Sequence, residues 1–224
     1  MISTQDTTIR HIRHAASGFI VAAAATAAAG AILFLGLQPT TDLSDDMWRY
    51  PWESSSAFVV FSLFSTVLHV LVIVGLRALG RSGVAGQSRP ATVGLALTLA
   101  GTSLLLVGEL ASIPIRDGRN DDANVGIVGA IFGFGGIAST IGFLLIGWTT
   151  LRARVWHDWR RFTPLATGVW LTAMTFIGIA APTALHGMVG IYGLCLLAVA
   201  IALYTQPAAT ASDTPVRVTP LAVE

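Results

Sequence analysis

Long apolar runs, separated by short polar connections, dominate the pattern along the chain. A helix of about 20 residues crosses the hydrocarbon core of a bilayer, which is roughly 30 Å thick. Six runs come close to or exceed this length: residues 15–37, 55–76, 92–113, 124–148, 164–181 and 184–204. The pattern predicts an all-α fold, a polytopic transmembrane helical bundle with six spans.

Proline marks several ends of these runs. Pro39 follows the first run and Pro164 opens the fifth. Proline is tolerated at the start of a helix and cannot continue one beyond its end. We therefore expect an N-terminal tail over 1–14, one transmembrane domain over 15–204, and a disordered tail over 205–224.

Charged residues are distributed unequally between the two sides of such a bundle. All 13 basic residues are arginine. Most lie in the tails or on the same side as the tails: Arg10, Arg13, Arg77, Arg81, Arg89, Arg152, Arg154, Arg160, Arg161 and Arg217. Only Arg49, Arg116 and Arg119 lie on the other side, among acidic residues. Because cytoplasmic loops carry the excess of basic residues, we predict that both termini are cytoplasmic, in a multi-pass protein of the cell membrane.

Composition narrows the classes of function. Of 224 residues, 54% are hydrophobic and 11% are charged, and the mean hydropathy is +0.71. One cysteine, Cys195, excludes an internal disulfide, and the absence of lysine excludes Schiff-base chemistry and a P-loop. A net charge of +1 provides no basic field for nucleic acid. We expect no nucleic-acid partner, no cofactor and no metal.

Glu109 is the one acidic residue within any predicted span. Thr102 and Ser112 share its face of the third span, because they lie seven and three residues away. Polar groups that face lipid are costly, so this face is expected to look into the bundle. Glu109 then lies about 6 Å from the outer end. It is either a ligand-binding or proton-carrying carboxyl, or a structural group bonded to Ser, Thr or Arg116.

Two histidines extend this polar region. His186 lies about 3 Å deep on the same side, so it is either an acid–base partner of Glu109 or an interfacial residue at a helix start. His69 lies about 21 Å from the outer end of its span, which is about 15 Å further in than Glu109. We interpret His69 as a midway proton relay or as a hydrogen-bonded core residue.

Aromatic residues crowd the first outer connection, which reads Met47-Trp48-Arg49-Tyr50-Pro51-Trp52-Glu53. Trp52 and its neighbours are predicted to form one of two structures. The first is a lid that accepts a cation over Glu109. The second is a belt of aromatic side chains at the level of the lipid headgroups.

The inner connection after the fourth span alternates arginine with aromatic residues. Six of its residues are predicted to bind anionic lipid headgroups: Arg152, Arg154, Trp156, Trp159, Arg160 and Arg161. Cations flanked by amphipathic rings suit the interface of a negatively charged leaflet. The expected partner is therefore the bilayer, with anionic lipid at the cytoplasmic face.

The fourth span carries a stripe of small residues, Gly126, Gly129, Gly133 and Gly136, at alternating spacings of three and four. Such a stripe lets the backbone of a second helix approach closely. We expect ordinary packing within the bundle. The alternatives are a substrate groove, a seam between identical chains, or a docking face for another membrane protein.

Three stretches resemble uncharacterised small actinobacterial membrane proteins with six spans. They are Tyr50-Pro51-Trp52, the segment from Arg160 to Trp170, and the segment from Gly190 to Cys195. The exclusive use of arginine and the richness in alanine are also typical of bacteria with GC-rich genomes. The resemblance implies the six-span topology and a bacterial source, and it implies no function and no site.

Three functions compete on the sequence. The first is binding or transport of a small ligand or a proton through an outward-facing pocket near Glu109. The second is an accessory or scaffold role, in which the glycine stripe of the fourth span binds another membrane protein. The third is an intramembrane enzyme with Glu109 and His186 as acid and base. Because no nucleophile is evident, we lean away from an enzyme.

Overall fold

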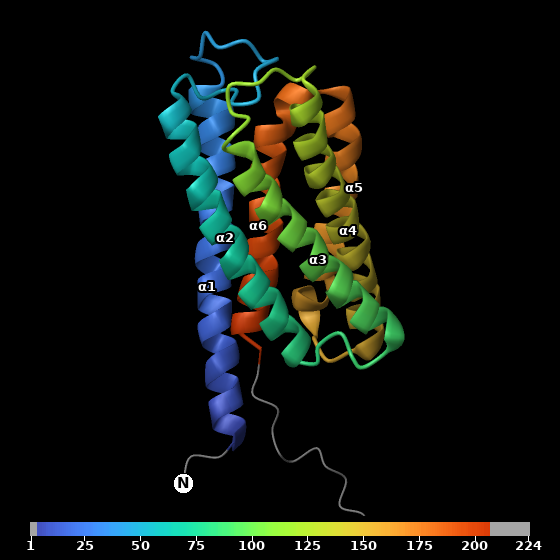
Figure 1. Ribbon diagram of the computed structural model, residues 1–224. Helices are drawn as coiled ribbons and strands as arrows, with labels where there is room; N and C mark the ends of the chain where they lie inside the picture. Colours follow the sequence, from blue (N-terminus) through green and yellow to red (C-terminus); the bar gives the residue numbers. More distant parts are fainter. Residues whose placement is uncertain (1–3, 207–224) are drawn as a thin grey trace, which may run out of the picture.

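The computed structural model describes residues 4–206 and shows six long helices standing side by side (Figure 1). The helices are α1 (Thr4–Ile32), α2 (Ser55–Arg81), α3 (Arg89–Ser112), α4 (Ala123–Ala153), α5 (Thr163–Ala180) and α6 (Leu185–Tyr204). A π-helical turn, Leu33–Leu37, continues α1, and two short 3-10 turns, Asp158–Phe162 and Pro182–Ala184, precede α5 and α6. The prediction of an all-helical fold is confirmed for the described residues, where the only β-type pairing is one bridge between Met47 and Arg119. All six helices are long and apolar enough to cross a membrane.

Several helices extend beyond the apolar runs that predicted them. The first begins at Thr4, inside the expected tail, and α2 and α4 end at Arg81 and Ala153 rather than near 76 and 148. Hydropathy marks the apolar part of a helix, whereas the backbone hydrogen bonds continue until a cap or a breaker ends them. The expected tail over 205–224 lies outside the described residues from 207 onward.

The loops divide the bundle into two ends. We call the end with connections 38–54 and 113–122 the acidic end, because it holds seven acidic residues: Asp42, Asp45, Asp46, Glu53, Asp117, Asp121 and Asp122. The opposite, basic end holds connections 82–88 and 154–162, and both α1 and α6 have their outermost described residues there (Figure 1). Serines cap the entries to two helices: Ser54 accepts from the Ala57 amide and Ser88 from the Ala91 amide.

The helices form a closed ring, in which each packs against the next along the chain and α6 packs against α1. The tightest seams are α3 with α4 and α1 with α6, where glycine removes the side chain between two backbones. A Cβ on Gly142 would lie 2.5 Å from the Thr98 nitrogen, and one on Gly30 would lie 2.3 Å from the Gly190 nitrogen. Small residues therefore join the first helix to the last.

The predicted glycine stripe of α4 does not take part in this packing. A Cβ on Gly126, Gly129, Gly133 or Gly136 would have no atom of another described helix or loop within 4 Å. Close contacts from α4 use Gly135 and Gly142 against α3 and Gly147 against Leu165 of α5. The expectation that the four glycines pack within the bundle thus fails, because α4 carries small residues on more than one face and spacing does not say which face meets a neighbour.

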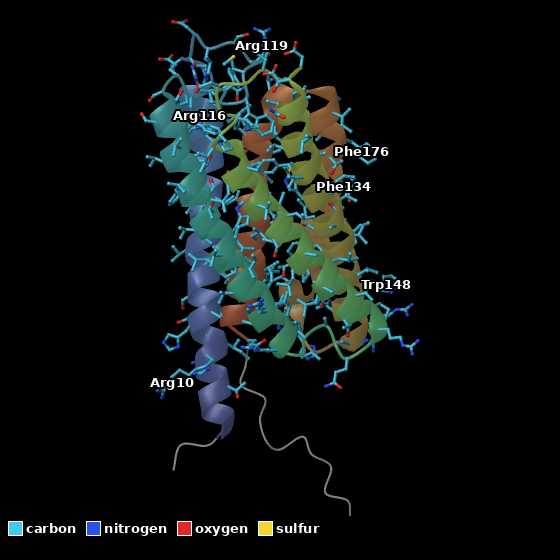
Figure 2. The ribbon with its side chains drawn as sticks, viewed as in Figure 1. Arg10, Arg116, Arg119, Phe134, Trp148 and Phe176 are labelled. Carbon is cyan, nitrogen blue, oxygen red and sulfur yellow. The ribbon has the colours of Figure 1, made fainter. Side chains whose placement is uncertain are left out.

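One continuous hydrophobic core fills the basic half of the ring. Its fully buried members include Phe19, Leu76, Phe143, Ile146 and Leu196, from α1, α2, α4 and α6. Large apolar side chains elsewhere point outward from the ring, as Phe134, Phe176 and Trp148 do in Figure 2. The half of the interior near the acidic end lies outside this core, and the candidate functional residues gather there.

Candidate functional site at the acidic end

The first loop of the acidic end places three aromatic side chains against three different helices. The Trp48 ring lies 6.1 Å from that of Phe132 on α4, between centroids. Tyr50 lies 6.3 Å from the ring of His186 on α6, and the Trp52 ring lies 5.0 Å from that of Phe61 on α2. We call Trp48, Tyr50 and Trp52 the aromatic lid. Because its rings reach α2, α4 and α6, the lid extends over the mouth of the ring.

Backbone hydrogen bonds hold the lid to the second loop of the acidic end. The Trp48 amide donates to the Gly118 carbonyl at 2.9 Å, and the Asn120 amide donates to the Asp46 carbonyl at 2.8 Å. Two ion pairs, Arg49 with Asp117 and Arg119 with Asp46, cross between the same loops. Figure 2 shows Arg116 and Arg119 at this end. The two loops therefore act as one unit.

Asp117 is the centre of the ionic contacts. The Ser55 hydroxyl donates to its carboxylate at 2.7 Å, Arg49 pairs with it, and Arg116 lies 3.6 Å away. The hydrogen bond from Ser55, with the charges of Arg49 and Arg116, lowers the pKa of Asp117, and partial desolvation opposes the shift. Asp117 thus stays ionised over a wide pH range and ties α2 to the second loop.

Glu109 lies on the face of α3 that carries its buried polar residues. Thr102 and Ser112 share this face and are buried, with 1% and 2% of their surfaces exposed, and Glu109 itself is half-buried. The hydroxyls donate into their own helix, Thr102 to the Thr98 carbonyl and Ser112 to the Gly108 carbonyl, both at 2.8 Å. These two hydroxyls therefore do not donate to the carboxyl of Glu109.

Each arginine of the acidic end is engaged with groups other than Glu109. Arg49 contacts Ser55 and Asp117. Arg116 donates to the Ile113 carbonyl at 2.9 Å and lies near Asp117, and Arg119 pairs with Asp46 and Asp121. Glu109 makes no hydrogen bond or ion pair with any residue from 4 to 206. The structural alternatives from the sequence, pairing with Arg116 or bonding to Ser or Thr, are not formed among the described residues.

His186 lies beneath the lid but does not meet Glu109. Its Nδ1 atom is buried with no hydrogen-bond partner among the described residues, and its ring packs against Tyr50. No nitrogen of its ring lies within the 4.0 Å that defines an ion pair with a described carboxylate. The predicted direct acid–base pair between Glu109 and His186 is absent within this part of the chain.

His69 lies near the middle of α2, 14 residues after its start at Ser55 and 12 residues before its end at Arg81. The Nδ1 atom of His69 is 2.9 Å from the Ser65 carbonyl, a contact within its own helix. The separation in depth between His69 and Glu109 that the sequence predicts stays a prediction.

The predicted lipid-binding segment at the basic end is only partly at the surface. Arg152 lies 4.4 Å over the Trp148 ring, and Arg154, Trp159 and Arg161 are exposed. Trp156 departs from the prediction: it is 3% exposed and belongs to the hydrophobic core, with its indole nitrogen donating to Gln206. Arg160 is half-buried and donates to Thr205. The segment thus also fixes the end of α6.

Within residues 4–206, no three His, Cys, Asp or Glu side chains are placed to hold a metal ion. The chemistry of the acidic half therefore rests on one carboxyl, two histidines and a group of aromatic rings. Sequence reasoning found Glu109, His69, His186 and the aromatic run. It missed Phe132 and Phe61, whose apolar runs give no sign that they meet the lid.

Comparisons with known proteins do not assign this chain to a family. No family model matches the sequence, no curated protein matches it, and no solved structure matches its fold. The resemblance to actinobacterial membrane proteins stays a prediction.

Proposed function

We propose that the protein spans the cell membrane six times, with the basic end in the cytoplasm and the acidic end outside. The length and apolar character of all six helices support this. The outward-pointing side chains are large and apolar, as Phe134, Phe176 and Trp148 illustrate (Figure 2), and hydrocarbon is the medium in which such a surface is stable. The concentration of arginine at the basic end supports the orientation.

We propose that the protein binds or transports a small ligand or a proton at a site facing the acidic end, with Glu109 as the central group. One observation carries this proposal: the half-buried carboxyl of Glu109 has no partner among the described residues, while Arg49, Arg116 and Arg119 are all engaged elsewhere. An ionisable group at membrane depth is costly, and such groups mark ligand or proton pathways.

The aromatic lid then controls access to this site. Trp48 lies over Phe132, and Phe132 in turn covers Gly108, where a Cβ would lie 2.9 Å from the edge of the ring. Gly108 precedes Glu109 in the chain, so the lid is connected to the turn that holds the carboxyl. A ligand from the acidic end reaches Glu109 when the lid moves. His69 on the neighbouring helix α2 and His186 on α6 provide further proton acceptors in the bundle.

Neutralising Glu109 tests the proposal. Wild type, Glu109→Gln and Glu53→Gln are reconstituted into vesicles loaded with a pH-sensitive dye, and proton entry is recorded after an acid pulse. The same proteins are extracted gently and weighed intact by native mass spectrometry. Glu53→Gln is the matched control, because it removes an exposed carboxylate from the same end of the bundle.

We expect a proton flux or a stoichiometric bound molecule in the wild type and in Glu53→Gln, and at least a tenfold loss in Glu109→Gln. If all three proteins behave alike in both measurements, the proposal is wrong.

A second candidate function is an accessory role in which α4 docks another membrane protein. The observation in its favour is the open face of Gly126, Gly129, Gly133 and Gly136, where no neighbouring helix or loop from residues 4 to 206 comes within 4 Å of an added Cβ. Leucine at Gly129 and Gly133 would block such a face. The control is Gly36→Leu, because Gly36 is equally open and lies on a different segment. A partner that co-purifies equally with both variants excludes this role.

The enzyme hypothesis receives less support. It requires Glu109 and His186 to act together on one substrate, and the two side chains form no ion pair within 4.0 Å in the described chain. We therefore base no proposal on catalysis.

A further inference from the structure

We propose that the ligand of the Glu109 site is a small organic cation that carries a substituted ammonium group. This inference rests on the proposed function and names the chemical class of its ligand. It follows from three features of the acidic half: the missing positive charge, the aromatic walls, and the small number of oxygen ligands.

The first feature is the missing positive charge. Among the described residues of the acidic end, each arginine already contacts one or more acids: Arg49 and Arg116 contact Asp117, and Arg119 contacts Asp46 and Asp121. Glu109 has no such neighbour. Burying an isolated charge is costly, so Glu109 is stable either as the neutral acid or as a carboxylate with a bound counter-ion. A ligand that binds the ionised form must therefore supply positive charge, which favours a cation over an anion or a neutral sugar.

The second feature is a group of aromatic rings at the acidic end, one of which, Phe132, lies against the residue that precedes Glu109. Trp48 and Phe132 stack at 6.1 Å and 41°, and Phe132 lies against the backbone of Gly108. Tyr50 and His186 form a second tilted pair at 6.3 Å and 50°. Aromatic faces attract cations, and alkylated ammonium groups are bound by such rings because their charge is spread over methyl or methylene groups. The rings thus favour an organic cation over a hydrated inorganic ion.

The third feature is the small number of oxygen ligands. Mg²⁺ takes about six oxygen ligands and Ca²⁺ takes about six to eight. Near Glu109 the described chain offers one carboxylate, and the hydroxyls of Thr102 and Ser112 are directed into their own helix. The absence of a described three-residue metal group agrees with this. One carboxylate and several rings match an ammonium ion, which needs one counter-charge and an apolar surround.

A pair of probes that differ only in charge tests the inference. Choline and 3,3-dimethylbutan-1-ol have nearly the same shape, and the quaternary nitrogen of the first is a carbon in the second. The binding of radiolabelled choline to the full chain in lipid nanodiscs is measured, and each unlabelled compound is then added as a competitor. Radiolabelled tetraphenylphosphonium, a larger aromatic cation, is measured in parallel so that a wider site is also detected.

We expect saturable binding of at least one of the two cations, and no displacement by the neutral alcohol at a hundredfold higher concentration. Glu109→Gln should weaken binding at least 30-fold, and the control Glu53→Gln should leave it unchanged. Trp48→Leu should weaken binding about 5- to 10-fold, and Trp48→Phe should restore most of it. Recovery in Trp48→Phe distinguishes an aromatic contact from a general disturbance of the lid.

The inference is overturned if neither cation binds saturably, or if the neutral alcohol competes as well as choline. In that case a proton flux or a bound neutral molecule that still requires Glu109 leaves the proposed function standing. If neither cation binding nor proton flux responds to Glu109→Gln, both proposals fail together.

Discussion

In the basic half of the bundle, side chains from α1, α2, α4, α5 and α6 meet in one hydrophobic core. In the acidic half, two loops close the ring through ion pairs, backbone hydrogen bonds and aromatic contacts. The first half places apolar groups where they are stable. The second holds a carboxyl and an imidazole nitrogen with no partner in the described chain. Apolar packing is thus concentrated in the basic half, and the acidic half keeps the unpartnered polar groups on which the proposed binding site rests.

The largest expected effect comes from removing a large ring from the basic half. Phe143 is fully buried, so Phe143→Ala should lower the free energy of unfolding by about 3–5 kcal/mol. Phe134 lies on the same helix with 67% of its surface exposed, and Phe134→Ala is the matched control with a small expected effect. Unfolding by SDS in mixed micelles measures both. Equal losses in the two variants would show that the core is not where the structure places it.

The opposite result is expected in the acidic half. Glu109→Leu replaces an unpartnered polar group with an apolar one, so it should raise the free energy of unfolding by about 1–3 kcal/mol. The same variant should abolish binding and proton flux, because functional groups are often kept at a cost in stability. If Glu109→Leu is destabilised and still functional, the proposal that Glu109 serves binding at a cost in stability is contradicted.

The two ends should also differ in how they use arginine. Arg152 and Arg161 at the basic end lie over aromatic rings and are exposed, whereas Arg49 at the acidic end is tied to Asp117. Replacing Arg152 and Arg161 by glutamine should weaken the binding of phosphatidylserine to the protein by about 1 kcal/mol per residue. Native mass spectrometry compares the amount of anionic lipid that stays bound to each variant. Arg49→Gln should retain as much anionic lipid as the wild type.

The smallest effect is expected at the ionic link between the loops. The folded protein lowers the pKa of Asp117 below its ordinary value of about 3.9. Its stabilising contribution is therefore fully present above roughly pH 4 and is lost as the pH falls through the lowered value. The protection factors of the amides in residues 113–122, which are corrected for the intrinsic pH dependence of exchange, should fall below that pH in the wild type. In Asp117→Asn the protection factors should be lower at neutral pH and should change less on acidification.

The sequence was sufficient to predict six helices, because each apolar run is as long as a membrane span and its ends carry prolines or polar connections. It was not sufficient to predict which polar side chains meet. Glu109 and His186 are both expected near the acidic end, yet they form no ion pair in the described chain. The reason is the order of the ring, in which α3 packs against α2 and α4, whereas α6 packs against α1 and α5.

A single sequence also does not determine which side of a helix packs against its neighbours. The spacing of Gly126, Gly129, Gly133 and Gly136 correctly places them along one side of a helix, but the neighbours of α4 lie elsewhere. Trp156 sits in an arginine-rich stretch that is typical of an interface, yet its ring fills the core. Both outcomes depend on where other helices lie, which is information from distant parts of the chain.

The seam between α1 and α6 has a consequence for biosynthesis. Gly30 and Gly193 bring the first and last helices into close contact, and α6 is synthesised after the other five. The neighbouring pairs from α1 to α5 are able to pack as they emerge, because domains assemble from the N-terminal side during synthesis. The glycine face of α1 then stays open until α6 arrives. A chain released before α6 is therefore an unclosed ring that exposes the glycine face of α1. Membrane chaperones and proteases recognise intermediates of this kind.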